Sequence, residues 1–127
     1  MHGKYLYEYA IIRLVPRVER EEFINVGVIV FIRQARFIKA LYHIDESRVV
    51  PFLGELELSV VCENLKAFDK ICKGDTTAGK VASWEMADRF RWLTAVRSSS
   101  IQTSRPHNGF SNDLENTVQS LLREQVL

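Results

Sequence analysis

The segment 89–112 carries side chains that can hold an anion, and it has no acidic residue. It contains four arginines, one histidine and seven serine or threonine hydroxyls. Removing these arginines from the chain's 17 Lys and Arg leaves 13 against 16 Asp and Glu, so a chain of net charge +1 concentrates positive charge here. Guanidinium groups beside hydroxyls suit a phosphate, a carboxylate or an acidic protein surface. We therefore expect an anion-binding surface in this segment.

The arginines of this segment fall in two settings, a serine-rich run and a predicted helix. Arg97 and Ser98 begin an Arg-Ser-Ser-Ser run whose hydroxyl and backbone N–H groups can cradle an oxyanion. The run lacks the glycines of a phosphate-binding loop or a dinucleotide fingerprint. Arg89 and Arg91 flank Phe90 in a predicted helix. The alternative is that these two arginines only solvate a helix face while Arg97 pairs with a carboxylate elsewhere.

A second polar group lies where the first two predicted strands meet, and it consists of Arg13, Glu22, Asn25 and Gly27. In an antiparallel hairpin centred near residue 19, Arg13 faces Asn25 and Ile11 faces Gly27. A glycine in the middle of a strand often marks the close approach of a ligand or of another backbone. These residues would then form a small polar patch with a guanidinium fork.

A structural explanation of the same residues stays open. Arg13 with Glu22, or Arg17 with Glu19, can form an ion pair that braces the loop between the strands. Gly27 would then mark a simple β-bulge.

His107 lies in the turn-forming run 105–109 beside the arginines. It is a candidate general acid or base, and the alternative is an exposed turn residue. His2 and His43 are not spaced with it as metal ligands would be. We therefore expect neither a metal nor a cofactor.

The cysteines and tryptophans are predicted to be structural. Cys62 and Cys72 lie in one predicted helix, about 15 Å apart along its axis, so they cannot form a disulfide with each other. Both are expected to be small buried hydrophobic residues. Trp84 and Trp92 are expected to anchor the core, because a base-stacking role needs aromatic side chains on an exposed basic sheet.

The elements that position these residues follow from hydrophobic periodicity. Strands are predicted over 5–15, 23–33 and 37–42, with a candidate fourth over 98–103. Even positions from Ile24 to Ile32 are β-branched and are expected to cover one face of the second strand. Asp45 is expected to cap a short helix that Pro51 kinks or ends. An amphipathic helix is expected to begin near Leu58 and to end near Gly74.

Two later helices are predicted to begin at Ser83 and Ser111. Strands first and helices afterwards indicate one α+β domain over 1–127. We expect an antiparallel sheet of three to four strands near the N-terminus, with helices packed on one face.

Composition limits the environment and the partners. The apolar run from Val26 to Ile32 is too short to span a bilayer, and the N-terminus shows no secretory signal, so we expect a cytoplasmic protein. A net charge of +1 argues against nucleic-acid binding.

The chain resembles a bacterial family catalogued as domain of unknown function 3037. The resembling segments are 7–16, 20–28, 89–94 and 97–102, followed by His107 and Gly109. Glu21 departs from the family pattern, which often has glycine there, so the first turn is expected to be less tight. The resemblance brings no activity, but it implies a partner or regulatory role with HipA-like kinases. The residues that stand out in the family pattern are Arg13, Glu22, Asn25, Gly27, Arg89, Arg91, Arg97, Ser98 and His107.

Three functional hypotheses remain. The first is a binding or regulatory module that holds a small anionic ligand or an acidic protein partner with its arginines. The alternative is an enzyme acting on a phosphorylated or nucleotide substrate, which requires Glu22 and His107 to lie at a common pocket. The third is a structural role in which the arginines tie the late segment to the sheet.

Overall fold

A computed structural model describes residues 5–17, 20, 22–95 and 99–127. The strands are β1 (Tyr5–Leu14), β2 (Ile24–Ile32), β3 (Phe37–Tyr42), β4 (Ile101–Thr103) and β5 (His107–Ser111). The α-helices are α1 (Glu46–Val49), α2 (Leu58–Lys73), α3 (Met86–Leu93) and α4 (Leu114–Gln125). Short 3-10 helices occupy Val50–Phe52, Thr76–Ala78 and Lys80–Ser83. Strands dominate the first part and helices the second, which confirms the predicted α+β class.

The sheet is antiparallel and has the order β3-β2-β1-β4, with β5 also paired to β1. Both late strands lie along the same edge of β1. β4 pairs with its end from Ile12 to Leu14, and β5 pairs with its beginning from Tyr5 to Tyr9. The predicted fourth strand is confirmed over Ile101–Thr103, and β5 is an additional strand. The acid-free segment is therefore hydrogen-bonded directly to the first hairpin.

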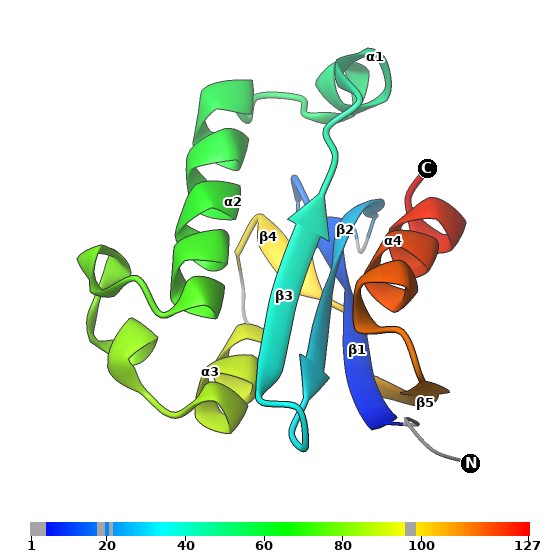
Figure 1. The fold of residues 1–127 in the computed structure, drawn as a ribbon. Coiled ribbons are helices and arrows are strands. Elements are labelled where there is room, and N and C mark those ends of the chain that lie inside the picture. The colour runs from blue at the N-terminus through cyan, green and yellow to red at the C-terminus, as the bar shows by residue number, and fades with distance from the viewer. Residues whose placement is uncertain (1–4, 18–19, 21, 96–98) are drawn as a thin grey trace.

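Helices cover both faces of the sheet, whereas the sequence analysis predicted helices on one face (Figure 1). α2 and α3 pack on the face that contains Ile12, Ile29 and Phe31. α4 packs on the opposite face through Val118 and Leu121. The physical reason is that β2 buries apolar side chains on both of its faces, and each face must be shielded from water.

A β-bulge in β2 overturns the predicted single β-branched face. The ladder pairs Ile12 with Gly27 but Arg13 with Asn25, so Val26 is an extra residue. An extra residue reverses the alternation of side chains. Ile24 and Val26 consequently pack on the α2 and α3 side, while Val28, Val30 and Ile32 pack on the α4 side.

The first two helix signals are confirmed. Asp45 precedes α1, and its carboxylate accepts a hydrogen bond from the Ser47 N–H. α2 ends at Gly74, which has a left-handed φ of 79°. α1 ends at Val49, and Pro51 lies in the 3-10 turn that follows, as its missing N–H allows.

The later two caps are displaced from the predicted serines. α3 follows Glu85, while the Ser83 hydroxyl donates to the Lys80 carbonyl. α4 begins after Asp113, whose carboxylate accepts from the Asn116 N–H. An aspartate closer to the first helical turn thus replaces Ser111 as the cap.

Candidate functional site

The Arg13 and Asn25 pairing is confirmed, and both side chains are engaged in packing. They face each other across β1 and β2. The Arg13 guanidinium lies 4.1 Å above the Phe23 ring, a cation–π contact, instead of pairing with Glu22. Asn25 Nδ2 donates to the Gln125 carbonyl at 3.0 Å and so holds the C-terminal end of α4. Arg13 Nε and Asn25 Oδ1 are buried without a hydrogen-bond partner among the described residues.

Gly27 is explained by the neighbouring strand. A Cβ at this position would lie 2.5 Å from the Leu41 carbonyl oxygen and 2.8 Å from the Tyr42 Cβ. The close approach therefore comes from β3. The bulge interpretation is confirmed, and the predicted partner Ile11 is wrong by one residue, because Ile12 faces Gly27.

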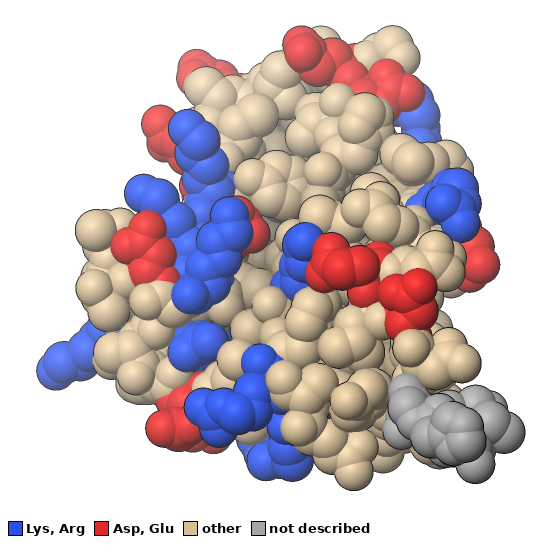
Figure 2. Space-filling model, in the orientation of Figure 1, with Lys and Arg blue, Asp and Glu red and all other residues tan. Residues whose placement is uncertain are grey.

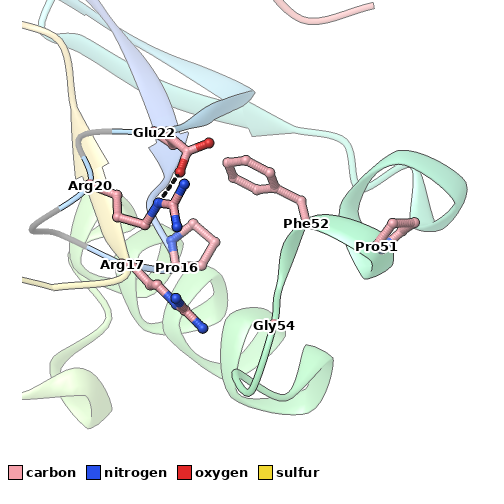
Figure 3. Close-up of a pocket in the computed structure, with 7 residues that line it drawn as sticks. All are labelled: Pro16, Arg17, Arg20, Glu22, Pro51, Phe52 and Gly54. Carbon is pink, nitrogen blue, oxygen red and sulfur yellow. Dashed lines mark hydrogen bonds and ion pairs between the residues drawn. The ribbon is translucent and has the colours of Figure 1, made fainter.

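Glu22 belongs to a depression at the β1–β2 end of the sheet (Figure 3). Its carboxylate pairs with Arg20 Nε at 2.5 Å. The other lining residues include Arg17 and Phe52, and the volume is about 200 Å³. The expected Arg17–Glu19 pair cannot be described, since Glu19 lies outside the described residues.

His107 is a strand residue, so the predicted turn is wrong at this position. It begins β5 opposite Tyr9, and the two rings are 5.4 Å apart. Glu22 lies beyond the other end of β1, near Leu14. From Tyr9 to Leu14 the strand extends about 17 Å. The common pocket that the enzyme hypothesis requires for Glu22 and His107 is therefore not formed.

Arg89 stabilises the junction of α2 and α3. Its Nη1 donates to the Trp84 carbonyl at 2.7 Å. A Cβ at Gly74 would lie 3.5 Å from the same nitrogen, so the guanidinium lies against the C-terminal end of α2. A cation is favourable at that end of the helix dipole.

Arg97 and Ser98, the first half of the predicted oxyanion cradle 97–100, lie outside the described residues. In the second half, the Ser99 hydroxyl donates to the Ile101 carbonyl at 2.6 Å, and the Ser100 hydroxyl accepts from Asn64 Nδ2 at 3.0 Å.

Arg91 joins two arginines that the sequence analysis did not select. Arg33 and Arg36, from the β2–β3 turn, line a depression of about 310 Å³ together with Arg91 of α3. We call Arg33, Arg36 and Arg91 the arginine cluster. Figure 2 shows basic side chains gathered around this turn, at the bottom of the view. Glu85 and Asp88 also line the depression, which leaves one net positive charge.

The local fold explains how the arginine cluster forms. The turn is closed by a hydrogen bond of 3.2 Å from the Arg36 N–H to the Arg33 carbonyl. Arg33 also lies 5.7 Å from the Phe31 ring, and Phe31 stacks on Phe90 of α3. That aromatic pair fixes α3 beside the end of β2. The turn lacks glycine and asparagine and is flanked by arginines, a signal that was visible in the sequence.

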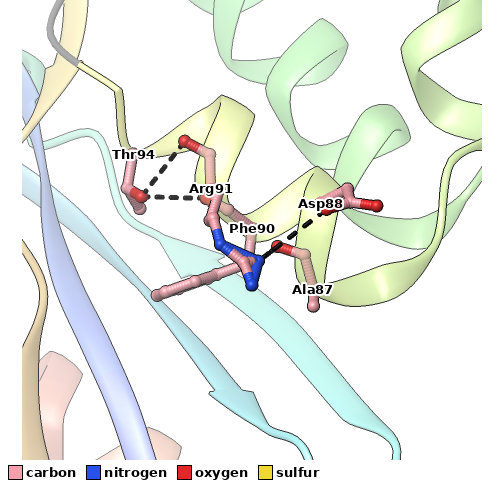
Figure 4. A network of polar contacts seen from close by, with 5 residues as sticks. All are labelled: Ala87, Asp88, Phe90, Arg91 and Thr94. Atoms are coloured by element: carbon pink, nitrogen blue, oxygen red, sulfur yellow. Dashed lines mark hydrogen bonds and ion pairs between the residues drawn. The ribbon is translucent and has the colours of Figure 1, made fainter.

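The partners of the Arg91 side chain among the described residues are weak. Its Nη1 lies 3.7 Å from the Asp88 carboxylate and 3.5 Å from the Ala87 carbonyl. Figure 4 shows this guanidinium beside Asp88, while Thr94 closes the end of α3. Both charged side chains of the ion pair are more than 60% exposed. Such pairs contribute about 0–1 kcal/mol. An incoming anion can therefore displace Asp88 at little cost.

Of the four predictions of burial, those for Cys62 and Trp84 are wrong and that for Cys72 is confirmed, while Trp92 is partly buried and packs against the core. Cys72 is buried, and burial raises the pKa of its thiol to about 12. Cys62 is exposed, because it lies on the outer side of α2. Trp84 is 42% exposed, since it follows a 3-10 turn and precedes α3 instead of lying in the helix. Neither residue contributes the core packing expected of it.

In the described part of the chain, no three His, Cys, Asp or Glu side chains are grouped as metal ligands would be. None of the helices there has the length and apolar character needed to cross a bilayer.

A family model described as protein of unknown function (DUF3037) matches residues 9–126. The chain belongs to this family. No curated protein and no solved structure matches it.

Proposed function

We propose that this chain is a binding module that holds an anionic group with the arginine cluster. The observation that carries the proposal is the convergence of Arg33 and Arg36 with Arg91, from a turn and a helix far apart in the sequence. Within the described residues, neither Arg33 nor Arg36 forms an ion pair. Guanidinium groups arranged in this way can donate to phosphate or carboxylate oxygens.

The backbone of Arg36 supports the proposal. Its φ is 49°, and it is the one non-glycine residue with positive φ in the described part of the chain. A left-handed conformation costs an ordinary L-residue about 1–2 kcal/mol, a cost that glycine avoids. An arginine at this position loses stability but places a third guanidinium in the cluster.

The other basic depression supports anion binding less well. Arg20 is already neutralised by Glu22 at 2.5 Å. A new anion there would have to compete with a short ion pair, whereas the ion pair described at the arginine cluster is the longer 3.7 Å contact of Arg91 with Asp88.

The anion can belong to a small ligand or to a protein. A HipA-like kinase, the partner that the family resemblance implies, would bind this cluster through carboxylates on its surface. Attraction between exposed charges acts mainly on the association rate and weakens as salt screens it. Binding through the cluster should accordingly weaken as the sodium chloride concentration rises.

Isothermal titration with inorganic pyrophosphate at constant ionic strength tests the proposal. We expect the separate variants Arg36→Ala and Arg91→Ala to bind about tenfold more weakly than the wild type, which corresponds to about 1.4 kcal/mol. Arg105→Ala is the matched control, because Arg105 is an exposed arginine of segment 89–112 outside the cluster. Equal affinity in all four proteins, or no pyrophosphate binding by the wild type, would contradict the proposal.

A further inference from the structure

A second depression lies on the outer side of α3 and shares Arg91 with the arginine cluster. Its lining residues are Trp84, Asp88, Arg91 and Trp92, and its volume is about 590 Å³. Asp88, Arg91 and Trp92 are spaced at i, i+3 and i+4, so they lie on one side of the helix. Arg91 therefore lies between an aromatic surface on one side and two further arginines on the other.

Trp84 is presented from a fixed backbone. Its N–H donates to the Val81 carbonyl at 3.0 Å, and its carbonyl accepts from Arg89 at 2.7 Å. Both backbone polar groups are thus satisfied while the indole stays 42% exposed. A tryptophan side chain has only two rotatable bonds, so it loses little conformational entropy when a partner covers it.

The composition of this surface is typical of protein interfaces. Tryptophan and arginine are enriched among the residues that carry most of the binding energy, and such residues cluster near the centre of an interface, inside a polar rim. Trp84 and Trp92 supply the apolar part. Arg91, Arg33 and Arg36 supply positive charge beside it.

We propose that this surface docks a segment of a partner protein in which an apolar side chain is followed or preceded by carboxylates. The apolar side chain covers Trp84, and the carboxylates contact Arg91 and the β2–β3 turn. Charge complementarity selects the acidic part of the segment, since the cluster leaves Arg33 and Arg36 without ion pairs in the described residues. The charged half of this inference rests on the proposed function.

Selection from a random dodecapeptide library displayed on phage, with the full chain immobilised, tests the specificity. We expect the selected peptides to be enriched in Asp or Glu beside Trp, Phe, Leu or Met. Selected peptides without acidic residues, or a selection that enriches no peptide, would overturn the inference.

Fluorescence polarisation with one labelled selected peptide then locates the site. We expect Trp84→Ala to bind it at least tenfold more weakly than the wild type. Phe110→Ala is the matched control, because Phe110 is an aromatic residue that is 71% exposed on β5. Equal loss in both variants, or none in Trp84→Ala, would overturn the docking surface.

Two further readouts separate the possible failures. Trp84→Ala should bind pyrophosphate as the wild type does, because Trp84 does not line the depression of the arginine cluster. Pyrophosphate binding that is indifferent to Arg91 would contradict the proposed function, whereas peptide binding that is indifferent to Trp84 would contradict the docking surface alone. Light scattering should give the same molecular mass for the wild type and for Trp84→Ala. If the wild type is a dimer and Trp84→Ala is a monomer, the surface binds a second copy of the chain, and the inference is overturned.

Discussion

Gly27 and Tyr42 face each other across β2 and β3 so closely that a Cβ on Gly27 would lie 2.8 Å from that of Tyr42. The space beside this glycine is therefore filled by a neighbouring strand. The same position starts the bulge that turns Asn25 towards α4. A residue that suggested a ligand from its sequence context is thus required for the packing of the sheet.

Replacing Gly27 with alanine should destabilise the fold. The new methyl group would meet the Leu41 carbonyl oxygen at 2.5 Å, and backbone atoms cannot move away without disturbing the ladder. We expect a loss of about 1–3 kcal/mol in the free energy of unfolding, the usual cost of overpacking. Urea denaturation followed by circular dichroism measures it.

Gly109→Ala is the matched comparison for this change. A Cβ there also overlaps a neighbour, but the neighbour is the far end of the Tyr7 ring, which can rotate. We expect a smaller loss, about 1 kcal/mol or less, because side chains relax more easily than backbone. A larger loss for Gly109→Ala than for Gly27→Ala would contradict this explanation.

Asn25→Ala should loosen the C-terminal end of α4. The change removes the 3.0 Å hydrogen bond to the Gln125 carbonyl, and it also removes Oδ1, which has no hydrogen-bond partner among the described residues. One such bond is worth about 1 kcal/mol. Hydrogen exchange should become faster in the last turn of α4 and stay unchanged in α2. The exposed Asn108 provides the control, and similar effects of Asn25→Ala and Asn108→Ala would count against a tether.

The two cysteines should react very differently with a thiol reagent. Cys62 is exposed, while burial raises the pKa of Cys72 from 9.0 to about 12. At pH 8.5 we expect Ellman's reagent to modify one thiol in the folded protein, none in Cys62→Ser, and two after unfolding of the wild type. Rapid modification of both thiols in the folded wild type would contradict the burial of Cys72.

The same pKa shift predicts a change of stability with pH. Above pH 9.0 the Cys72 thiol of the unfolded chain loses its proton, while that of the folded chain keeps it up to about pH 12. The unfolded state then binds fewer protons, so the free energy of unfolding falls as pH rises through this range. Cys72→Ala should show a smaller fall between pH 9 and 10.5 than the wild type.

Arg36→Gly should separate stability from binding. Glycine relieves the left-handed φ of 49° but adds flexibility to the unfolded chain, so we expect a net gain of about 0.5–1 kcal/mol. Pyrophosphate affinity should fall as it does in Arg36→Ala, which gains no stability. Thermal denaturation and calorimetry of both variants measure the two effects. A less stable Arg36→Gly variant would show that the arginine is retained for structural reasons.

The sequence predicted the hairpin strands well because their patterns are local. β3 has its predicted bounds, and Gly74 ends α2 as expected. The second apolar face of β2 was missed, since a single extra residue at Val26 reverses the alternation. Gly27 signalled a bulge, but the even positions on both sides of it were still assigned to one face. β5 was read as a turn because Asn108 and Gly109 favour turns, whereas pairing with β1 decides its conformation.

The candidate site was predicted only in part, for a similar reason. Arg91 came from the charge of segment 89–112, but its companions Arg33 and Arg36 lie outside that segment. The packing of Phe31 against Phe90 holds the helix beside the turn, and such a contact has no local sequence signal. The sequence analysis selected Arg13, Asn25 and Arg89 as candidate anion-binding residues, and in the structure their side chains hold elements together.

Chemical-shift mapping tests the central claim most directly. Nitrogen-15 spectra of the full chain are recorded during a titration with inorganic pyrophosphate at constant ionic strength. We predict saturable shifts of Arg33, Arg36 and Arg91 and their neighbours, with little change at Arg17 and Arg20 in the depression at the other end of the sheet. Shifts confined to Arg17 and Arg20, or spread evenly over all exposed basic residues, would contradict an anion site at the arginine cluster.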